Sequence, residues 1–480
     1  MSDYTPTIGI ECHVQLKTKT KLFAAVANDA REAPPNTLIS QICLGMPGAL
    51  PVLNSAAVDL AVKAAFALST TPQPFSTFDR KHYFYPDLPK GYQISQLYQP
   101  IILGGHVDIE VDGVKKRIGV TRAHLEEDAG KSTHPAGKNY SLVDLNRAGT
   151  PLLEIVSEPD ITSAAEAKAY AHELYLLMRY AEVSDANLFY GNMRFDVNVS
   201  VSKENGVLGT RTETKNLNSF KAVEKSIEYE IRRQIDVLES GGTVVQETRG
   251  WDDTALKTFS QRTKEDAHDY RYFPDPDIPP VVLEQSVIDA AKAAMPAMPS
   301  DVRNKLRTLS IDESAVETIV DELVAADIIL KCSEMNAAQE DIRRIALWLA
   351  GDVQGYVANN EAAKWEDLQL DHSALLTLSK LTADSKVSST GAKAILNQLI
   401  QSGGDPNKIA EELDVLQVSD TGELEASVAE VLTQNEKAAE DVKNGEMKAI
   451  GFLVGQIMKQ SKGKANPQLA QELIKKQLGL

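Results

Sequence analysis

Two short segments of the chain alternate apolar and polar residues with a period of two, the pattern of a β-strand that buries one face. In residues 8–16, the alternation places Glu11 and His13 opposite four apolar side chains. In residues 191–201, it places Asp196 on the polar face in the same way. A strand with carboxylate and imidazole groups on its open face can supply ligands to a hard cation. The sequence therefore predicts a sheet with a candidate magnesium site, and magnesium there indicates phosphate chemistry.

Cysteine usage and hydrophobic runs indicate the compartment. The three cysteines, Cys12, Cys43 and Cys332, are too few and too scattered for a disulfide framework, so we expect a reducing, cytoplasmic setting. Residues 1–6 lack a basic segment followed by an apolar run, so we expect no signal peptide. No apolar stretch approaches the roughly 20 residues that span a bilayer, and we expect no membrane partner.

Helix signals and breaks divide the chain. The first part mixes short alternating runs with two helix signals, a capping box at Ser163 and an apolar stripe over residues 220–238. The proline-rich residues 275–280 mark its end. The following sequence favours helix throughout, with one break at residues 402–406. We predict an α+β fold with three domains: a mixed-sheet domain over 1–292, an all-α helical domain over 293–402 and a small all-α tail over 403–480.

The charge distribution bears on nucleic-acid binding. The formal net charge of −18 argues against non-specific nucleic-acid binding over the whole surface. Residues 448–480 reverse this sign locally, with six lysines and one glutamate. On charge alone, two interpretations stay open: a solvated helical face, or a contact with a phosphate backbone.

Further acidic residues accompany the two alternating strands. The run Glu126-Glu127-Asp128 follows an apolar segment, and Glu154 interrupts an apolar run that favours a strand. Carboxylates buried together need a cation or a proton to offset their repulsion. Oxygen ligands with one imidazole favour Mg²⁺ or Mn²⁺ over zinc. The alternative is an exposed turn at 126–128 and a salt-bridge partner at Glu154, because the sequence does not show that these segments converge.

Other motifs are weaker. Residues 78–93 interleave basic and aromatic side chains, which suits a phosphate or an RNA end but equally a packed loop with extended lysines. Gly130-Lys131-Ser132 looks like the end of a P-loop, but Leu125 stands where the loop needs glycine. The sequence contains neither H-E-x-x-H nor G-x-S-x-G, so a nucleophile that releases ammonia from an amide is not evident.

Seven blocks of sequence, taken together, are more specific than any single motif. They match one family in order and spacing: residues 8–16, 43–51, 78–96, 125–132, 144–155, 215–220 and 269–274. The chain resembles the B subunits of bacterial aspartyl/glutamyl-tRNA amidotransferases. The likeness continues into the tail segments 451–455 and 462–467.

The resemblance implies a cradle domain, a helical domain and a tail, and it implies a reaction. ATP with Mg²⁺, or with Mn²⁺, phosphorylates the side-chain carboxylate of misacylated Glu-tRNA(Gln) or Asp-tRNA(Asn). Ammonia from a partner amidase, the glutaminase of the complex, then displaces the phosphate. The same complex contains a third, small protein. The implied enzyme is an ATP-dependent carbon–nitrogen ligase that uses glutamine as amide donor. The resemblance also favours a tRNA contact for the basic tail.

The resemblance further assigns roles to individual side chains. Six fall on metal positions: Glu11, His13, Glu126, Glu127, Glu154 and Asp196. The predicted catalytic set adds to Glu127 three residues near the ammonia route: Lys81, Tyr83 and Lys90. Three more are assigned to the nucleotide: Arg194, Glu213 and Lys215. The chemistry agrees, because phosphoryl transfer needs cations that offset charge on the transferring oxygens.

One departure from the family concerns zinc. Many members carry a four-cysteine zinc knuckle, with one cysteine pair after a Leu-Phe and another before a Leu-Gly-Met-Pro-Gly. Here Ala-Ala-Val follows the Leu-Phe at 22–23, and only Cys43 remains. A structural zinc site needs about four such ligands, so we expect no zinc. We expect apolar packing by Ala24, Val26 and Ile42 in its place.

A second class of function remains as an alternative, a non-catalytic tRNA-binding scaffold for the amidase. The carboxylates distinguish the two, because a scaffold has no use for buried metal ligands. Which of them applies depends on whether the acidic segments meet in space.

Overall fold

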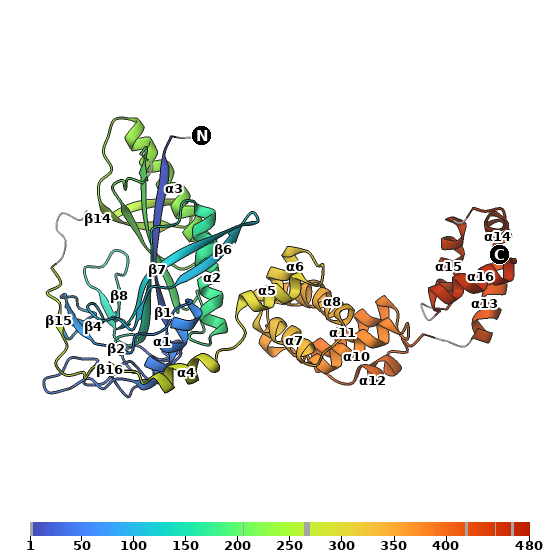
Figure 1. The fold of residues 1–480 in the computed structure, drawn as a ribbon, viewed down its shortest axis with the longest axis horizontal. Helices are drawn as coiled ribbons and strands as arrows, with labels where there is room; N and C mark the ends of the chain where they lie inside the picture. Colours follow the sequence, from blue (N-terminus) through green and yellow to red (C-terminus); the bar gives the residue numbers. More distant parts are fainter. Residues whose placement is uncertain (1–2, 205, 264–268, 418–420, 447, 462–464) are drawn as a thin grey trace. The chain divides into compact units, whose positions relative to one another are not determined.

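The structure of the 480-residue chain is a computed structural model (Figure 1). It describes every residue except 1–2, 205, 264–268, 418–420, 447 and 462–464. The chain divides into two compact units, Met1–Met298 and Pro299–Leu480. Each unit is described by itself below.

The first unit is built on a nine-stranded sheet in the order β14-β13-β12-β11-β1-β10-β7-β5, with β6 paired to β7. Its pairs are antiparallel apart from the parallel pair β12 and β13. A mixed sheet followed by helices confirms the α+β prediction. The strands are β1 (Thr5–Gln15), β5 (Ile102–Leu103), β6 (His106–Val111), β7 (Val114–Glu127), β10 (Pro151–Ser157), β11 (Met193–Ser202), β12 (Thr212–Leu217), β13 (Glu247–Asp252) and β14 (Lys257–Thr263).

The central strands have one apolar face, as their alternation predicts. Ile10 and Val14 of β1 and Val197 of β11 are at most 1% exposed. They share a core with Leu174 and Val223 of the covering helices. Burying this face removes apolar surface from water, and that burial is the main term that stabilises the sheet. Three helices contribute to this core: α1 (Ser55–Ala67), α2 (Ala164–Tyr180) and α3 (Phe220–Glu239).

The two helices predicted from the sequence are present. Ser163 caps α2 by accepting the N–H of Glu166 at 3.1 Å, and Ser219 caps α3 in the same way. A serine at the N-cap satisfies one of the N–H groups that the first helical turn leaves unpaired. Helix α3 ends at Glu239, before Gly241 with φ of 79°. A glycine in this left-handed conformation is a common way for a helix to end.

Small sheets surround the main one. Strands β15, β3 and β4 form one sheet, β16 and β2 a second, and β8 and β9 a third. Strand β4 contacts β7 of the main sheet, and α4 (Gln285–Ala293) packs on α1 within the first unit. The bounds are β2 (Phe75–Ser76), β3 (Asp79–His82), β4 (Tyr92–Ser95), β8 (Lys131–Thr133), β9 (Leu142–Asp144), β15 (Phe273–Pro274) and β16 (Val281–Val282).

The described part of the second unit is helical. Residues such as Leu453, Ile457 and Ile474 form a core of their own near its end. The predicted division at residue 402 stays a prediction. The elements are α5 (Pro299–Arg307), α6 (Glu313–Asp321), α7 (Leu323–Glu334), α8 (Gln339–Leu347), the π-helix η1 (Trp348–Val353), α9 (Gln354–Ala358), the 3₁₀ turn η2 (Trp365–Asp367), α10 (His372–Ala383), α11 (Ser389–Ser402), α12 (Pro406–Glu412), α13 (Thr421–Gln434), α14 (Glu436–Lys443), α15 (Lys448–Gln460) and α16 (Pro467–Leu478).

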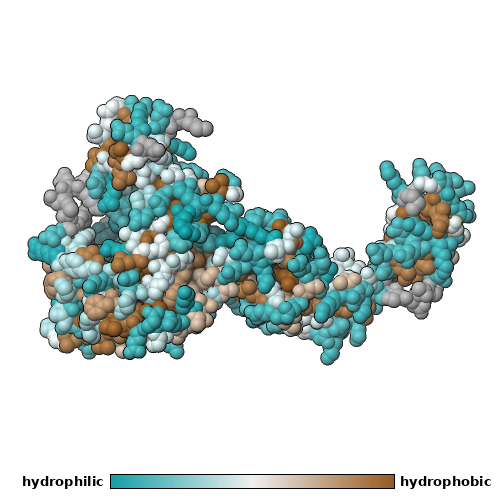
Figure 2. Space-filling view, viewed as in Figure 1, coloured by the Kyte–Doolittle hydropathy of each residue, from teal (hydrophilic) through white to brown (hydrophobic). Residues whose placement is uncertain are grey.

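The surface mixes polar and apolar residues. On the face drawn in Figure 2, hydrophobic residues are interspersed with hydrophilic ones over both units. Among the described residues, no helix combines the length and the apolar character that a membrane span requires.

Candidate active site

Cross-strand register brings the predicted ligands together on the polar face of the main sheet. Strand β1 lies between β10 and β11, so His13 pairs with Glu154 on one side, and Glu11 pairs with Asp196 on the other. Glu154 in turn pairs with His124 of β7. Side chains directly opposite each other on neighbouring antiparallel strands lie about 5 Å apart. The strands β7, β10, β1 and β11 therefore carry one continuous row of titratable groups.

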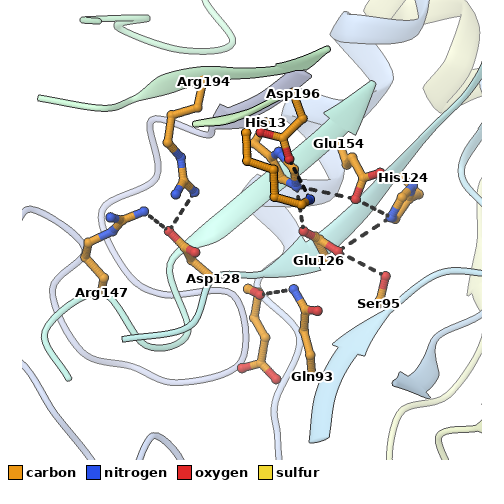
Figure 3. Close-up of polar contacts among 12 residues, drawn as sticks. His13, Gln93, Ser95, His124, Glu126, Asp128, Arg147, Glu154, Arg194 and Asp196 are labelled. Carbon is orange, nitrogen blue, oxygen red and sulfur yellow. Dashed lines mark hydrogen bonds and ion pairs between the residues drawn. The ribbon is translucent and has the colours of Figure 1, made fainter. Parts of the chain in front are cut away.

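The first cluster contains His13, Glu126 and Glu154, whose candidate ligand atoms lie within 4.8 Å of one another. His13 Nε2 is 3.5 Å from Glu126 Oε1 and 3.5 Å from Glu154 Oε2 (Figure 3). Glu126 is 3% exposed. The alternative of an exposed turn at residues 126–128 is therefore wrong for Glu126. One imidazole and two carboxylates at these distances fit a divalent cation such as Mg²⁺ or Mn²⁺.

The second cluster contains Glu11, Asp196 and Glu213, again with ligand atoms within 4.8 Å of one another. Lys215 supplies a positive charge to it, with Nζ 3.0 Å from Asp196 Oδ2 and 2.9 Å from Glu213 Oε1. Thr248 Oγ1 donates to the other Glu213 oxygen at 3.1 Å. Glu213, predicted to contact the nucleotide, thus stands among the candidate metal ligands. Three carboxylates also fit a hard cation.

The charges of the two clusters act on each other. Burial disfavours charge on His13, but Glu126 and Glu154 outweigh burial and raise the pKa of the imidazole well above its usual value. Burial also opposes the charge of Glu154, but His124 and His13 lower the pKa of that carboxyl group to about 2. Burial and the neighbouring Glu154 raise the pKa of Glu11. Glu11 therefore lies where carboxylates repel one another, and a bound cation would relieve that repulsion.

The hairpin of β3 and β4 brings the predicted ammonia-route residues to this face. Burial opposes the charge of Lys81, but Glu126 outweighs it and raises the pKa of the ammonium group. The hydroxyl of Tyr83 donates to Gln93 Oε1 at 3.5 Å, and burial raises the pKa of Tyr83. Gln93 in turn donates to the backbone carbonyl of Glu127 at 2.7 Å. These contacts tie Tyr83 to the end of β7, while Lys81 lies within the field of the first cluster.

Glu127 departs from its predicted role as a metal ligand. Its carboxylate forms an ion pair with Lys90 and accepts the N–H of Ile94 at 3.0 Å. Neither of the two clusters includes it. Adjacent residues of a strand point to opposite faces, so Glu126 and Glu127 cannot both face His13. The geometry assigns Glu127 to the hairpin, next to Lys90.

Two residues of the site were not predicted, His124 and Arg147. His124 Nε2 lies 3.6 Å from Glu126 Oε2 and 3.5 Å from Glu154 Oε2, and its Nδ1 has no hydrogen-bond partner among the described residues. The period of two could have indicated His124, because it shares a face with Glu126. Arg147 forms an ion pair with Asp128. It lies in a turn, for which alternation gives no signal.

The segment for which the sequence predicts apolar packing in place of a zinc knuckle contains a buried lysine. Lys21 is 0% exposed, and its Nζ donates to the carbonyl of Leu38 at 2.7 Å and to that of Ala148 at 2.6 Å. Cys43 Sγ lies 3.6 Å from the same nitrogen. The predicted apolar packing is only partly present, since Ala24 is buried but Val26 and Ile42 are only half-buried. An ammonium group joins these loops through hydrogen bonds.

Comparison with known families covers most of the chain. Residues 6–289 match the family described as "GatB/GatE catalytic domain", and residues 331–478 match the family described as "GatB domain". The first match contains every residue of both clusters.

Curated relatives align with the chain over nearly its whole length. A protein of Alkalilimnicola ehrlichii is 47% identical over 481 residues, 99% of each chain. One of Carboxydothermus hydrogenoformans is 44% identical over 486 residues, 100% of this chain and 99% of the relative. One of Caldicellulosiruptor bescii is 42% identical over 480 residues, 99% of each chain. All three are named as B subunits of an aspartyl/glutamyl-tRNA(Asn/Gln) amidotransferase.

Proposed function

The chain belongs to the family of aspartyl/glutamyl-tRNA(Asn/Gln) amidotransferase B subunits, and on this basis we propose the reaction that its sheet carries out. The protein uses ATP to phosphorylate the side-chain carboxylate of Glu-tRNA(Gln), Asp-tRNA(Asn) or both. It then amidates the activated group with ammonia from an amidase partner of the same complex. The products are Gln-tRNA(Gln) and Asn-tRNA(Asn), ADP and phosphate.

The observation that carries this proposal is the convergence of two ligand clusters on one face of the sheet. Buried carboxylates that only brace a fold are normally paired one to one with cations. Here six acidic and imidazole groups from β1, β7, β10, β11 and β12 meet on one face of the sheet, and Lys215 pairs with two of them. A scaffold for another enzyme would not need this arrangement, whereas phosphoryl transfer does.

The residues of the two clusters would hold divalent cations. A bound Mg²⁺ or Mn²⁺ would supply positive charge that offsets the charge of the ATP phosphates. Lys215 lies at the second cluster and can pair with a phosphate oxygen when the carboxylates face a cation. Lys81, held charged next to Glu126, adds a positive group on the side of the hairpin.

The bond changes need a separate source of ammonia. An oxygen of the substrate carboxylate attacks the γ-phosphorus of ATP, and the bond to ADP breaks. Ammonia then attacks the acyl carbon, the carbon–oxygen bond to phosphate breaks, and the nitrogen loses a proton to give the amide. The carboxylate itself is a poor electrophile, so the phosphate provides the leaving group. The ion pair of Lys90 with Glu127 lies on the hairpin beside this face, and the proposed ammonia route enters there.

The test uses the complex of this chain with its amidase partner, supplied with ATP, ammonium and Glu-tRNA(Gln). Glu154→Gln and Asp196→Asn should each lower ammonium-supported amidation by about 100-fold or more, because each removes a charge from a cluster. Glutaminase activity of the partner should persist in part. Glu32→Gln changes an exposed carboxylate of the same unit and should leave amidation unchanged.

The outcome also separates the alternative function. If Glu154→Gln and Asp196→Asn amidate at the wild-type rate, the clusters have no part in activation. The chain would then be a tRNA-binding scaffold, and the activation step would belong to another protein of the complex.

A further inference from the structure

Arg147, Arg194 and Asp128 form a group beside the first cluster. We propose that Arg147 and Arg194 are a two-arginine clamp for the phosphoryl group that ATP transfers. This inference rests on the proposed function and adds the place where the transferred group binds. The family resemblance assigns no role to Arg147.

The two guanidinium groups converge on one oxygen. Arg147 Nη2 and Arg194 Nη2 both donate to Asp128 Oδ2, the latter at 3.2 Å (Figure 3). Within the described residues, Asp128 is the acceptor shown for either guanidinium group. A guanidinium has five N–H donors, so most donors of each arginine have no acceptor among the residues that the structure describes. Two like charges are thus held together with unused hydrogen-bonding capacity, which is what a phosphate requires.

The position of the clamp relates it to the clusters. Arg194 pairs directly with His13 across β11 and β1, and it stands two residues from Asp196 on the same face. Its side chain is 21% exposed, and that of Arg147 is 34% exposed. The clamp is therefore open on one side and lies next to both ligand clusters. The cross-strand pairing makes Arg194 the direct neighbour of the candidate ligand His13.

The turn that carries Arg147 is fixed at several points. Asp128 N donates to Thr150 O at 2.8 Å, and Gly149 N donates back to Asp128 O at 2.9 Å. Gly149 has φ of 86°, which residues with a Cβ rarely adopt. Lys21 Nζ holds the intervening carbonyl of Ala148 at 2.6 Å. A flexible brace would not need this anchoring, whereas a binding group gains from being positioned before the ligand arrives.

A structural role for the group is the competing explanation. An Arg–Asp–Arg set could simply join the turn to β11. A brace of that kind would saturate the guanidinium groups with protein acceptors and bury them, since unpaired buried donors are costly. Here Asp128 neutralises one of two positive charges and leaves one for a ligand. A net positive, partly open site beside candidate metal ligands favours an anion, and the transferred phosphoryl group is the anion of the proposed reaction.

The experiment measures the affinity of the complex for ATP, ADP and inorganic phosphate in the presence of Mg²⁺, with Arg147→Met, Arg147→Lys and wild type. Arg147→Met should raise the Kd for ATP about 10- to 100-fold, and should weaken competitive inhibition by inorganic phosphate by a similar factor. The Kd for ADP should change by less than about threefold, because ADP lacks the transferred group. Arg147→Lys should recover part of the loss, because lysine keeps the charge but not the paired donors.

Arg117→Met is the matched control, because Arg117 pairs with Asp108 in the exposed hairpin of β6 and β7. It should leave all three affinities unchanged. The clamp is refuted if Arg147→Met leaves ATP binding and phosphate inhibition unchanged, or weakens ADP as much as ATP. It is also refuted if the variant weakens binding of Glu-tRNA instead, since Arg147 would then contact RNA. Glu154→Gln serves as the separate test: if it abolishes amidation while Arg147→Met changes nothing, the clamp fails and the proposed function stands.

Discussion

Under the proposed function, cation binding at His13 is coupled to the release of a proton. Without a cation, Glu126 and Glu154 outweigh burial and keep the pKa of His13 well above 6.5. A folded-state pKa above the unfolded value means that the imidazolium stabilises the fold below about pH 6.5. This contribution is lost as the pH rises through the raised pKa. A metal ligand must be the neutral imidazole, so protons compete with the cation.

The apparent affinity for Mn²⁺ should therefore rise with pH, by about tenfold per unit while His13 is still protonated. Titration calorimetry or Mn²⁺ electron paramagnetic resonance between pH 6 and 8 measures this slope. His13→Gln should bind Mn²⁺ more weakly and with a much smaller slope. A slope that persists in His13→Gln would place the competing proton on another group.

Lys21 stabilises the turn that contains Arg147, because its ammonium group donates to the carbonyl of Ala148. Lys21→Met replaces the aliphatic part of the side chain but leaves the carbonyls of Leu38 and Ala148 without their donor. We expect the local opening free energy of residues 147–150 to fall by about 1–3 kcal/mol. Hydrogen exchange read by mass spectrometry measures this at the amides of Gly149 and Thr150.

The matched control for Lys21 is Lys19→Met, which changes an exposed lysine of the same segment and should not affect exchange at residues 147–150. Equal protection in Lys21→Met and wild type would mean that the turn holds without the ammonium group.

Among the elements, α3 is joined to the far edge of the sheet through one buried carboxylate. Glu230 is 0% exposed and accepts from Thr212 of β12 at 2.8 Å, and it pairs with Arg249 of β13 at 3.0 Å. Glu230→Ala would leave Arg249, itself 8% exposed, without this partner. Arg249 keeps its ion pair with Glu247, so the loss is that of one charged hydrogen-bond partner, which costs about 1.5–3 kcal/mol. We expect the free energy of unfolding of the first unit to fall by that amount.

Trp251 of β13 reports this loss by fluorescence, in a background where Trp348 and Trp365 of the second unit are phenylalanine. Urea unfolding of Glu230→Ala is compared with Glu228→Ala, whose partner Lys225 lies at the surface of the same helix. The control should lose less than about 1 kcal/mol. Equal losses in the two variants would contradict a special role for Glu230.

The elements also show what the sequence can predict. Alternation alone assigns the correct faces of β1 and β11, the capping box at Ser163 predicts the start of α2, and the apolar stripe predicts α3. These are local signals, because each is set by residues within one or two turns or strand repeats. The same rule separates Glu126 from Glu127, and applying it would have removed Glu127 from the metal ligands.

Local patterns do not predict which residues of different strands lie next to each other. His13 pairs with Glu154, and Glu154 pairs with His124, through registers between strands that are distant along the chain. Register depends on the packing of the whole sheet, and no local pattern within a strand encodes it. The position of Arg147 is even harder to predict from the sequence, because Arg147 lies in a turn that is held by Lys21 and Asp128 from two other segments. Only the resemblance to a family indicated that the acidic segments converge.

At the scale of the whole molecule, the uneven distribution of charge along the chain bears on tRNA binding. The net charge is −18, yet the exposed lysines Lys448, Lys459 and Lys476 belong to a segment of opposite sign. Lys462 and Lys464, which are part of that sequence prediction, lie outside the described residues. Deleting the segment would remove Leu453 and other core residues of its helices, so loss of binding after deletion would not isolate charge.

Charge substitution avoids that problem. Lys448, Lys459 and Lys475, changed together to glutamine, keep the helices and remove three positive charges. If they contact the tRNA backbone, the slope of log K against log salt should decrease by about 0.7–0.9 for each phosphate contact that the substitutions remove. Binding of Glu-tRNA(Gln) to the complex, measured by fluorescence anisotropy between about 50 and 200 mM salt, gives the slope.

The control is the triple variant Lys364→Gln, Lys380→Gln and Lys408→Gln, which removes the same charge from exposed positions before the basic segment that starts at residue 448. It should change the affinity slightly and the slope hardly at all. If the tail lysines act on tRNA binding and the sheet on chemistry, amidation at saturating tRNA should stay within about twofold of wild type in the tail variant. A tail variant with an unchanged salt slope would mean that these lysines form a solvated helical face, and the sign reversal would then have no role in recognition.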